Sequence, residues 1–171
     1  MARNVEIKAR IDSVAALLPR AAQLAGSAAT ILRQEDTFFA CPHGRLKLRD
    51  QFEAGAELIF YRRADQSGPK ESFYERVPVQ DPQRLCEVLS LAHGQIGRIR
   101  KRRLLFLVGR TRIHLDEVEG LGAFVELEVV LRAGESVASG TAEAHRLMGE
   151  LGIGAQQLIE GAYLDLPPAA P

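Results

Sequence analysis

Hydrophobic and polar residues alternate along most of the chain, and a period of two predicts strands. The clearest case is near the N-terminus, where Val5, Ile7 and Ala9 share one face and Glu6 and Lys8 share the other. The same alternation, bounded by turn residues, predicts eight strands. These lie at residues 3–11, 28–41, 45–50, 57–64, 70–79, 95–108, 110–118 and 123–132.

Between these strands the pattern changes to the helical period. A cap at residue 12 or 13 predicts a helix that continues to about residue 24 and ends near Gly26. Asp81, followed by Pro82, begins a second helix, because proline fits the first helical position. A third helix is predicted at 136–151, and a short helical stretch at 156–163.

The connections between most strands are short, which favours an antiparallel sheet. Eight strands are enough to close into a barrel, with the helices packed outside it. We therefore predict the α+β class, with an eight-stranded antiparallel closed barrel, and a single domain over residues 1–171 whose core spans about 2–166.

Composition narrows the functions that this fold can have. Lys plus Arg and Asp plus Glu both number 22 in 171 residues, so the chain is neither a basic nucleic-acid wrapper nor an acidic tail. Apolar runs are too short to cross a bilayer, and charges stand where a signal peptide needs an apolar centre. Two cysteines make no disulfide framework. We expect a cytoplasmic protein, a monomer or homodimer, with no membrane or nucleic-acid partner.

One face of nearly every predicted strand carries charge, and the signs are organised. In chain order these residues are Glu6, Lys8, Lys47, Arg49, Arg62, Lys70, Lys101, Arg103, Arg112, His114, Asp116, Glu126 and Glu128. A half-solvated sheet with weak salt bridges would explain any single strand. If all these faces line one barrel, the charges must be paired, hydrated or bound to a ligand. Carboxylates suit Mg²⁺ or Mn²⁺, and Lys and Arg suit a polyphosphate.

The residues resemble the CYTH domain family, the triphosphate tunnel metalloenzymes. The matching segments are Asn4-Val5-Glu6-Ile7-Lys8, Leu46-Lys47-Leu48-Arg49, Ile99-Arg100-Lys101-Arg102-Arg103, His114-Leu115-Asp116, Phe124-Val125-Glu126-Leu127-Glu128 and Ala162-Tyr163-Leu164-Asp165-Leu166. The resemblance implies a tunnel that binds a triphosphate with Mg²⁺ or Mn²⁺. It implies metal ligation by Glu6, Asp116, Glu126 and Glu128. It also implies triphosphate contacts by Lys8, Lys47, Arg49, Arg62, Lys70, Lys101, Arg103, Arg112 and His114.

The resemblance leaves three functions open. The chain looks most like the class IV adenylyl cyclases, which convert ATP to cyclic AMP and pyrophosphate. The alternatives are an inorganic or thiamine triphosphatase and a non-catalytic binder of nucleotide or polyphosphate. Asn4 stands where the family's opening signature has an acid, which removes one charge from the metal site. Lys8 is the candidate proton acceptor, since a lysine among cations can have a lowered pKa.

Overall fold

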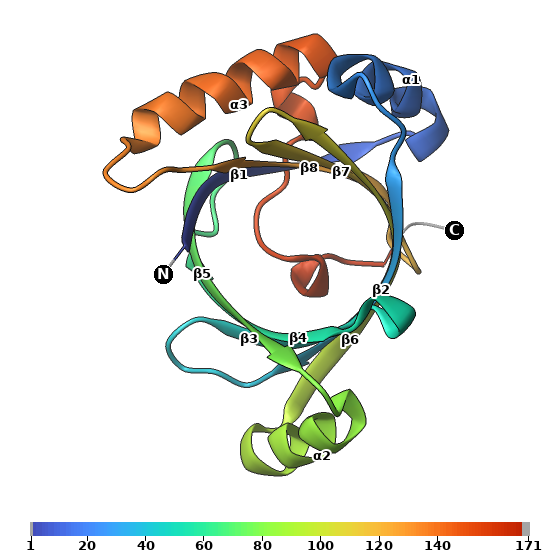
Figure 1. Cartoon of the computed structure of the whole chain (residues 1–171), viewed down its shortest axis with the longest axis vertical. Helices are drawn as coiled ribbons and strands as arrows, with labels where there is room; N and C mark the ends of the chain where they lie inside the picture. The colour runs from blue at the N-terminus through green and yellow to red at the C-terminus, as the bar shows by residue number, and fades with distance from the viewer. Residues whose placement is uncertain (1, 169–171) are drawn as a thin grey trace.

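The computed structural model describes residues 2–168, in which eight strands close into a barrel (Figure 1). The strands are β1 (Ala2–Ile11), β2 (Thr30–Phe39), β3 (Arg45–Asp50), β4 (Ala56–Arg63), β5 (Lys70–Val79), β6 (Gln95–Val108), β7 (Thr111–Val118) and β8 (Gly122–Val130). Around the barrel their order is β1-β5-β4-β3-β2-β6-β7-β8. Every neighbouring pair is antiparallel, so the predicted architecture is confirmed.

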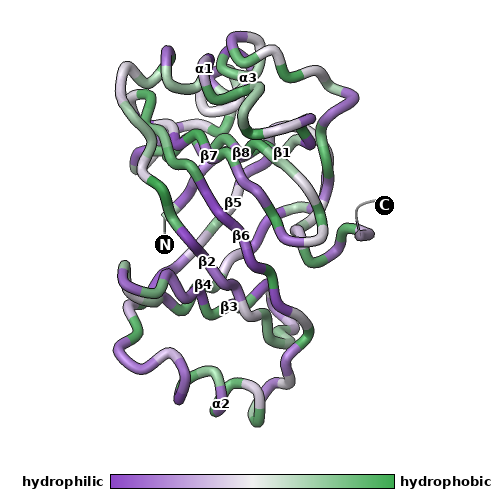
Figure 2. The backbone as a smooth tube through the Cα atoms, turned by 90° about the vertical axis from the view of Figure 1, so that its right-hand side faces the viewer, coloured by the Kyte–Doolittle hydropathy of each residue, from purple (hydrophilic) through white to green (hydrophobic). Residues whose placement is uncertain are grey.

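Three α-helices lie outside the barrel: α1 (Val14–Ala25), α2 (Pro82–His93) and α3 (Val137–Leu151). In Figure 2, α1 and α3 lie together beside β1, β7 and β8, and α2 lies at the far side of the barrel, near β2 and β3. The predicted helix starts are confirmed, since Ser13 Oγ accepts from the Ala16 amide and Asp81 Oδ1 accepts from the Arg84 amide. None of the helices in residues 2–168 has the length and apolarity to span a membrane.

The largest hydrophobic core lies between the outer wall of the barrel and helices α1 and α3. Val5 and Ile7 of β1 point into it, and they pack in one cluster with Leu17 of α1 and with Leu147 and Leu151 of α3. Because side chains alternate along a strand, the opposite face of β1 points into the barrel. Apolar burial thus stabilises the outer face of this part of the barrel, and polar residues occupy its inner face.

The segment after α3 closes one end of the barrel, and we call residues 159–166 the plug. The helix predicted at 156–163 is wrong: the chain forms two single 3₁₀ turns, η2 (Ala155–Gln157) and η3 (Tyr163–Asp165), with a non-helical segment between them that bends at Gly161. The Ile159 amide donates to the Lys8 carbonyl at 3.0 Å, and η3 then lies inside the ring of strands (Figure 1). A Cβ at Gly97 of β6 would lie 2.1 Å from Leu164 Cδ1, so a larger residue there would displace the Leu164 side chain.

A short 3₁₀ turn that the alternation does not predict, η1 (Phe52–Ala54), joins β3 to β4. Phe52 there has a φ of 54°, a left-handed conformation that is costly for a bulky residue. The turn leaves Gln51 among the residues that line the barrel interior.

Candidate functional site

The barrel encloses a cavity of about 290 Å³, and every strand contributes side chains to its lining. The charged and titratable lining residues are Glu6, Lys8, Asp36, Lys47, Arg49, Glu57, Tyr61, Arg63, Tyr74, Arg76, Lys101, Arg103, Arg112, His114, Glu126, Glu128 and Tyr163. Lys101 is 7% exposed and Arg103 is 4% exposed, so these cations face the cavity and not the solvent. The organised charges of the sequence therefore converge on one enclosed space.

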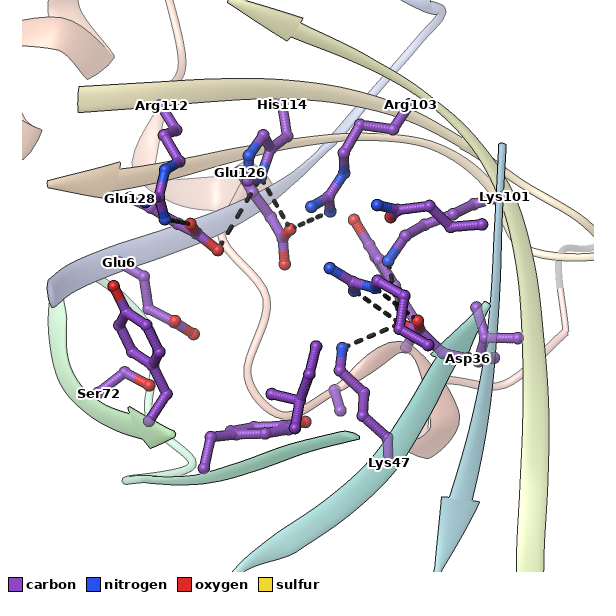
Figure 3. Close-up of a pocket in the computed structure, with 18 of the residues that line it drawn as sticks. Glu6, Asp36, Lys47, Ser72, Lys101, Arg103, Arg112, His114, Glu126 and Glu128 are labelled. Carbon is purple, nitrogen blue, oxygen red and sulfur yellow. Dashed lines mark hydrogen bonds and ion pairs between the residues drawn. The ribbon is translucent and has the colours of Figure 1, made fainter. Parts of the chain in front are cut away.

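One side of the cavity is a group of three cations around a single acid (Figure 3). Asp36 of β2 accepts from Lys47 Nζ at 2.9 Å, from Arg49 Nε at 2.7 Å and from Lys101 Nζ at 3.3 Å. Burial alone would raise the pKa of Asp36, but the three cations outweigh it and hold the pKa well below the ordinary value. We call Asp36, Lys47, Arg49 and Lys101 the basic group.

Burial also acts on the lysines of this group. It lowers the pKa of Lys47 to about 8, and Arg49 adds to this effect by repulsion. It lowers the pKa of Lys101 to about 7, because the attraction of Asp36 only partly offsets the loss of water. An anion that enters the cavity would therefore meet amines that gain a proton readily when it binds.

The other side of the cavity carries a candidate metal site formed by His114, Glu126 and Glu128. One ligand atom from each residue lies within 4.8 Å of the others. His114 Nδ1 is 3.5 Å from Glu126 Oε2 and 3.9 Å from Glu128 Oε1, and Figure 3 shows the three side chains converging. This buried nitrogen has no hydrogen-bond partner within residues 2–168. An unpartnered nitrogen beside two carboxylates fits a divalent cation, and its nitrogen donor suits Mn²⁺ better than Mg²⁺.

The carboxylates of this site are ionised because cations surround them. Burial would raise the pKa of Glu126, but Lys8 and Arg103 outweigh it and hold the pKa well below the ordinary value. Lys8 Nζ lies 2.9 Å from Glu126 Oε1 and 3.8 Å from the centroid of the Tyr163 ring. Arg112 lies 3.2 Å from Glu128.

Two predicted metal ligands have other partners in the structure. Asp116 accepts two hydrogen bonds from Arg103, at 2.7 and 2.6 Å, and one from the Tyr163 hydroxyl at 2.8 Å, while Arg103 also donates to Glu126. It does not belong to the cluster of His114, Glu126 and Glu128. Glu6 lines the cavity but is paired with Arg63. Glu126 and Glu128 thus lie together, as predicted, and His114 lies with them. Asp116 instead forms an ion pair with Arg103.

Two predicted triphosphate contacts lie elsewhere. Arg62 of β4 is exposed on the outer face, and Arg63 takes the inward position. The reason is that both faces of β4 carry apolar residues, so alternation does not identify the inner face. Lys70 is buried but is not among the cavity-lining residues, and its Nζ donates to the Gln66 carbonyl at 2.6 Å. Lys8, Lys47, Arg49, Lys101, Arg103, Arg112 and His114 all line the cavity as predicted.

Asp36 and Tyr163 belong to the site but are not among the residues predicted from the sequence. Asp36 shares the inward face of β2 with Gln34 and Phe38, so the alternation around it was a usable signal. Tyr163 lies in the plug, whose path into the barrel depends on long-range packing against Phe124 with ring centroids 4.9 Å apart. No local pattern in the sequence specifies that path.

The outward arginines of β6 are paired with acids on neighbouring strands. Arg98 and Arg100 contact Glu35 at 3.2 and 2.5 Å, and Arg102 contacts Glu117 at 3.3 Å. The basic run at 98–103 is thus divided between the two faces of the wall, and its outer members are neutralised locally.

The chain is similar to known proteins in both sequence and fold. The model of the CYTH domain matches residues 2–163. Adenylate cyclase CyaB from Aeromonas hydrophila is 26% identical over 172 residues, which cover 95% of this chain and 87% of that protein. The PH1012 protein from Pyrococcus horikoshii OT3 has a TM-score of 0.83 at 22% identity, covering 95% of this chain and 98% of that one. HpAC1 from Hippeastrum, a proposed adenylyl cyclase with a dominant triphosphatase activity, has a TM-score of 0.61 at 20% identity, covering 88% of each chain. Both structural matches show a shared fold.

Proposed function

The chain belongs to the CYTH domain family, which includes metal-dependent adenylyl cyclases and triphosphatases, and we propose that it cleaves a triphosphate-bearing substrate inside the barrel. The observation that supports this most directly is the division of one enclosed cavity into two halves. The basic group lies on one side, and His114, Glu126 and Glu128 lie on the other. In a metal-bound triphosphate, the negative phosphate oxygens match the basic group and the divalent cation matches the two carboxylates.

The basic group would bind the phosphate chain. Arg49 offers a planar fork for phosphate oxygens, and Lys47 and Lys101 offer point charges. All three already hold the Asp36 carboxylate, so they are in place before a ligand arrives. Donors fixed in advance in a water-poor cavity are the main source of electrostatic catalysis in phosphoryl transfer.

Glu126 and Glu128, with His114, would hold the divalent ion, for which we propose Mg²⁺ or Mn²⁺. When bound, such an ion supplies Lewis-acid polarisation of phosphate oxygens. Glu6 lies at the same cavity and would complete the set once Arg63 turns to the phosphate. Asp116 would act indirectly, since it fixes the Arg103 guanidinium beside Glu126.

The reaction also needs a group that accepts a proton from the attacking hydroxyl or water. We propose Lys8 for this role because its Nζ lines the cavity next to the candidate metal site, where the attacking group would be activated.

We propose the cyclase reaction, ATP to cyclic AMP and pyrophosphate, on the similarity to Adenylate cyclase CyaB. The second candidate is a triphosphatase, favoured by the activity of HpAC1. The two differ in the nucleophile: a ribose hydroxyl attacks the α-phosphorus in the first, and water attacks the terminal phosphorus in the second.

The test is to incubate the protein with Mg²⁺ or Mn²⁺ and with ATP, tripolyphosphate or thiamine triphosphate in turn. Cyclic AMP with pyrophosphate supports the cyclase, and orthophosphate supports the triphosphatase. Metal-dependent binding without product would overturn the enzymatic proposal and leave a binding protein. The absence of both binding and product would overturn the proposal altogether.

A further inference from the structure

The cavity changes character along its length. On the inward face of β2, Phe38 lies at the plug end, and Asp36, Gln34 and Leu32 follow in the direction away from the plug. On β6, which pairs with β2, the lining residue farthest from the plug is Leu105, opposite Thr30. Beyond Asp36 the inward side chains of β2 are therefore an amide and a leucine, which lie opposite Lys101 and Arg103 of β6, and Leu105 follows at the far end of this wall.

The plug fixes the direction in which a ligand can extend. Phe38, Phe124 and Tyr163 pack together in one buried cluster at the plug end. A phosphate chain held by the basic group is blocked on that side. Any group attached to the chain then lies toward the other end of the cavity, where Gln34, Leu32 and Leu105 line one wall and Arg112 and Tyr74 line the wall across from it.

Gln34 is 4% exposed and makes only part of its hydrogen bonds. Its Nε2 donates to Gln51 Oε1 at 2.8 Å, and its Oε1 has no hydrogen-bond partner among the described residues. The η1 turn fixes the chain at Gln51, because the Gln51 amide donates to the Gly55 carbonyl at 2.9 Å. A buried carbonyl oxygen without a donor is costly unless a ligand supplies one.

Inorganic polyphosphate at neutral pH offers essentially only acceptors and cannot satisfy Gln34 Oε1. An adenine ring offers an amino donor next to a ring-nitrogen acceptor, which a glutamine amide can match with its oxygen and one N–H. In Gln34 the Oε1 atom and one Nε2 hydrogen remain available, because Gln51 accepts only one of the two Nε2 hydrogens of Gln34. Guanine presents two acceptors at the corresponding edge and would oppose the Gln34 oxygen.

We propose that Gln34, supported by Gln51, is a specificity-determining residue that recognises the adenine base of a nucleoside triphosphate, with Leu32 and Leu105 beside the ring. This inference rests on the proposed function, because it takes the phosphate chain to lie on the basic group. It makes the preferred ligand ATP and not inorganic tripolyphosphate or GTP.

The test is calorimetric binding of ATP, GTP and tripolyphosphate in EDTA, where a metal-dependent reaction does not run. We expect Gln34→Leu to weaken ATP binding about 10-fold and to change tripolyphosphate binding less than about 2-fold. Gln51→Leu should weaken ATP binding in the same direction by a smaller factor. Gln83→Leu, on the exposed face of α2, is the matched control and should change neither ligand.

The outcomes separate this inference from the proposed function. Equal weakening of ATP and tripolyphosphate by Gln34→Leu, or no weakening of either, would overturn base recognition. So would wild-type protein that binds GTP as tightly as ATP. If Gln34→Leu does not fold, the same comparison is made with Gln51→Leu, and equal effects on the two ligands again overturn the inference. Wild-type protein that binds none of the three ligands, either in EDTA or with Mn²⁺ present, would overturn the proposed function itself.

Discussion

Arg103 and Asp116 form a two-point ion pair inside the barrel wall, with N–O distances of 2.7 and 2.6 Å. Arg103 is 4% exposed and Asp116 is fully buried, so both charges are removed from bulk solvent. We expect Asp116→Asn to lower the free energy of unfolding by about 3–5 kcal/mol, because it leaves a buried guanidinium short of a counter-charge. Urea denaturation measures this change.

The control for this variant is Glu117→Gln, the next residue on β7, which faces outward and pairs with the exposed Arg102. It should change stability by less than about 1 kcal/mol, as exposed pairs generally do. Equal stability of Asp116→Asn and wild type would show that the pair does not hold the wall together.

The proposed metal site predicts a loss of cation binding when one carboxylate is neutralised. Wild-type protein should gain thermal stability with Mn²⁺, since a ligand that binds only the folded state stabilises it. Glu128→Gln should lose most of this gain, because it removes one ligand charge next to His114 and Glu126. Thermal unfolding with and without Mn²⁺ measures the difference.

Glu117→Gln serves again as the control and should keep the full response to Mn²⁺. A Glu128→Gln protein that responds to Mn²⁺ like wild type would exclude Glu128 as a ligand.

Strand alternation predicts the barrel and most of its lining, because the inner face of most strands carries charged or polar residues at every second position. This held for β1, where Val5 and Ile7 lie in the outer core and Glu6 and Lys8 line the cavity. It fails on β4, where Ile59 faces inward and apolar residues also occupy the other face, so the pattern does not distinguish Arg63, which lines the cavity, from Arg62.

Partner choice inside the cavity could not be predicted from alternation. Asp116 points inward as expected, but its distance to Arg103 depends on the register of β6 against β7. The position of Tyr163 depends on the plug passing Gly97, a contact between residues that are far apart in the sequence. The face of the sheet on which a side chain lies is a local property of its strand. The ion pairs inside the cavity and the position of the plug depend on tertiary structure.

The lowered pKa of Lys101 predicts two opposite effects of pH. Burial brings this pKa to about 7, and Lys47 follows at about 8, whereas an unfolded lysine titrates near 10.4. Between these values the unfolded chain binds more protons than the folded one, so these groups make the free protein more stable as pH rises from about 7 to 10. Binding of a polyanion favours the protonated amines, so affinity for tripolyphosphate should fall over the same range.

Calorimetry in buffers with different ionisation enthalpies checks this, and proton uptake on tripolyphosphate binding is expected at pH 8. Lys101→Met should reduce the uptake and flatten the pH dependence. Binding without proton uptake at pH 8 would contradict the lowered pKa of both lysines.

Asp36 predicts a variant that is less stable alone and more responsive to ligand. Its carboxylate is shared by Lys47, Arg49 and Lys101, so Asp36→Asn leaves three cations close together without their common anion. We expect the melting temperature of the free variant to fall by several degrees, since a buried charge that loses its partner is strongly destabilising. Tripolyphosphate supplies the missing negative charge and should therefore raise the melting temperature of the variant more than that of the wild type. The control is Glu35→Gln, on the outward face of the same strand, which should show the wild-type response. A smaller gain in melting temperature for Asp36→Asn than for wild type would contradict this prediction. It would mean that the Asp36 carboxylate positions the cations for the phosphate and does not occupy the place of a phosphate group.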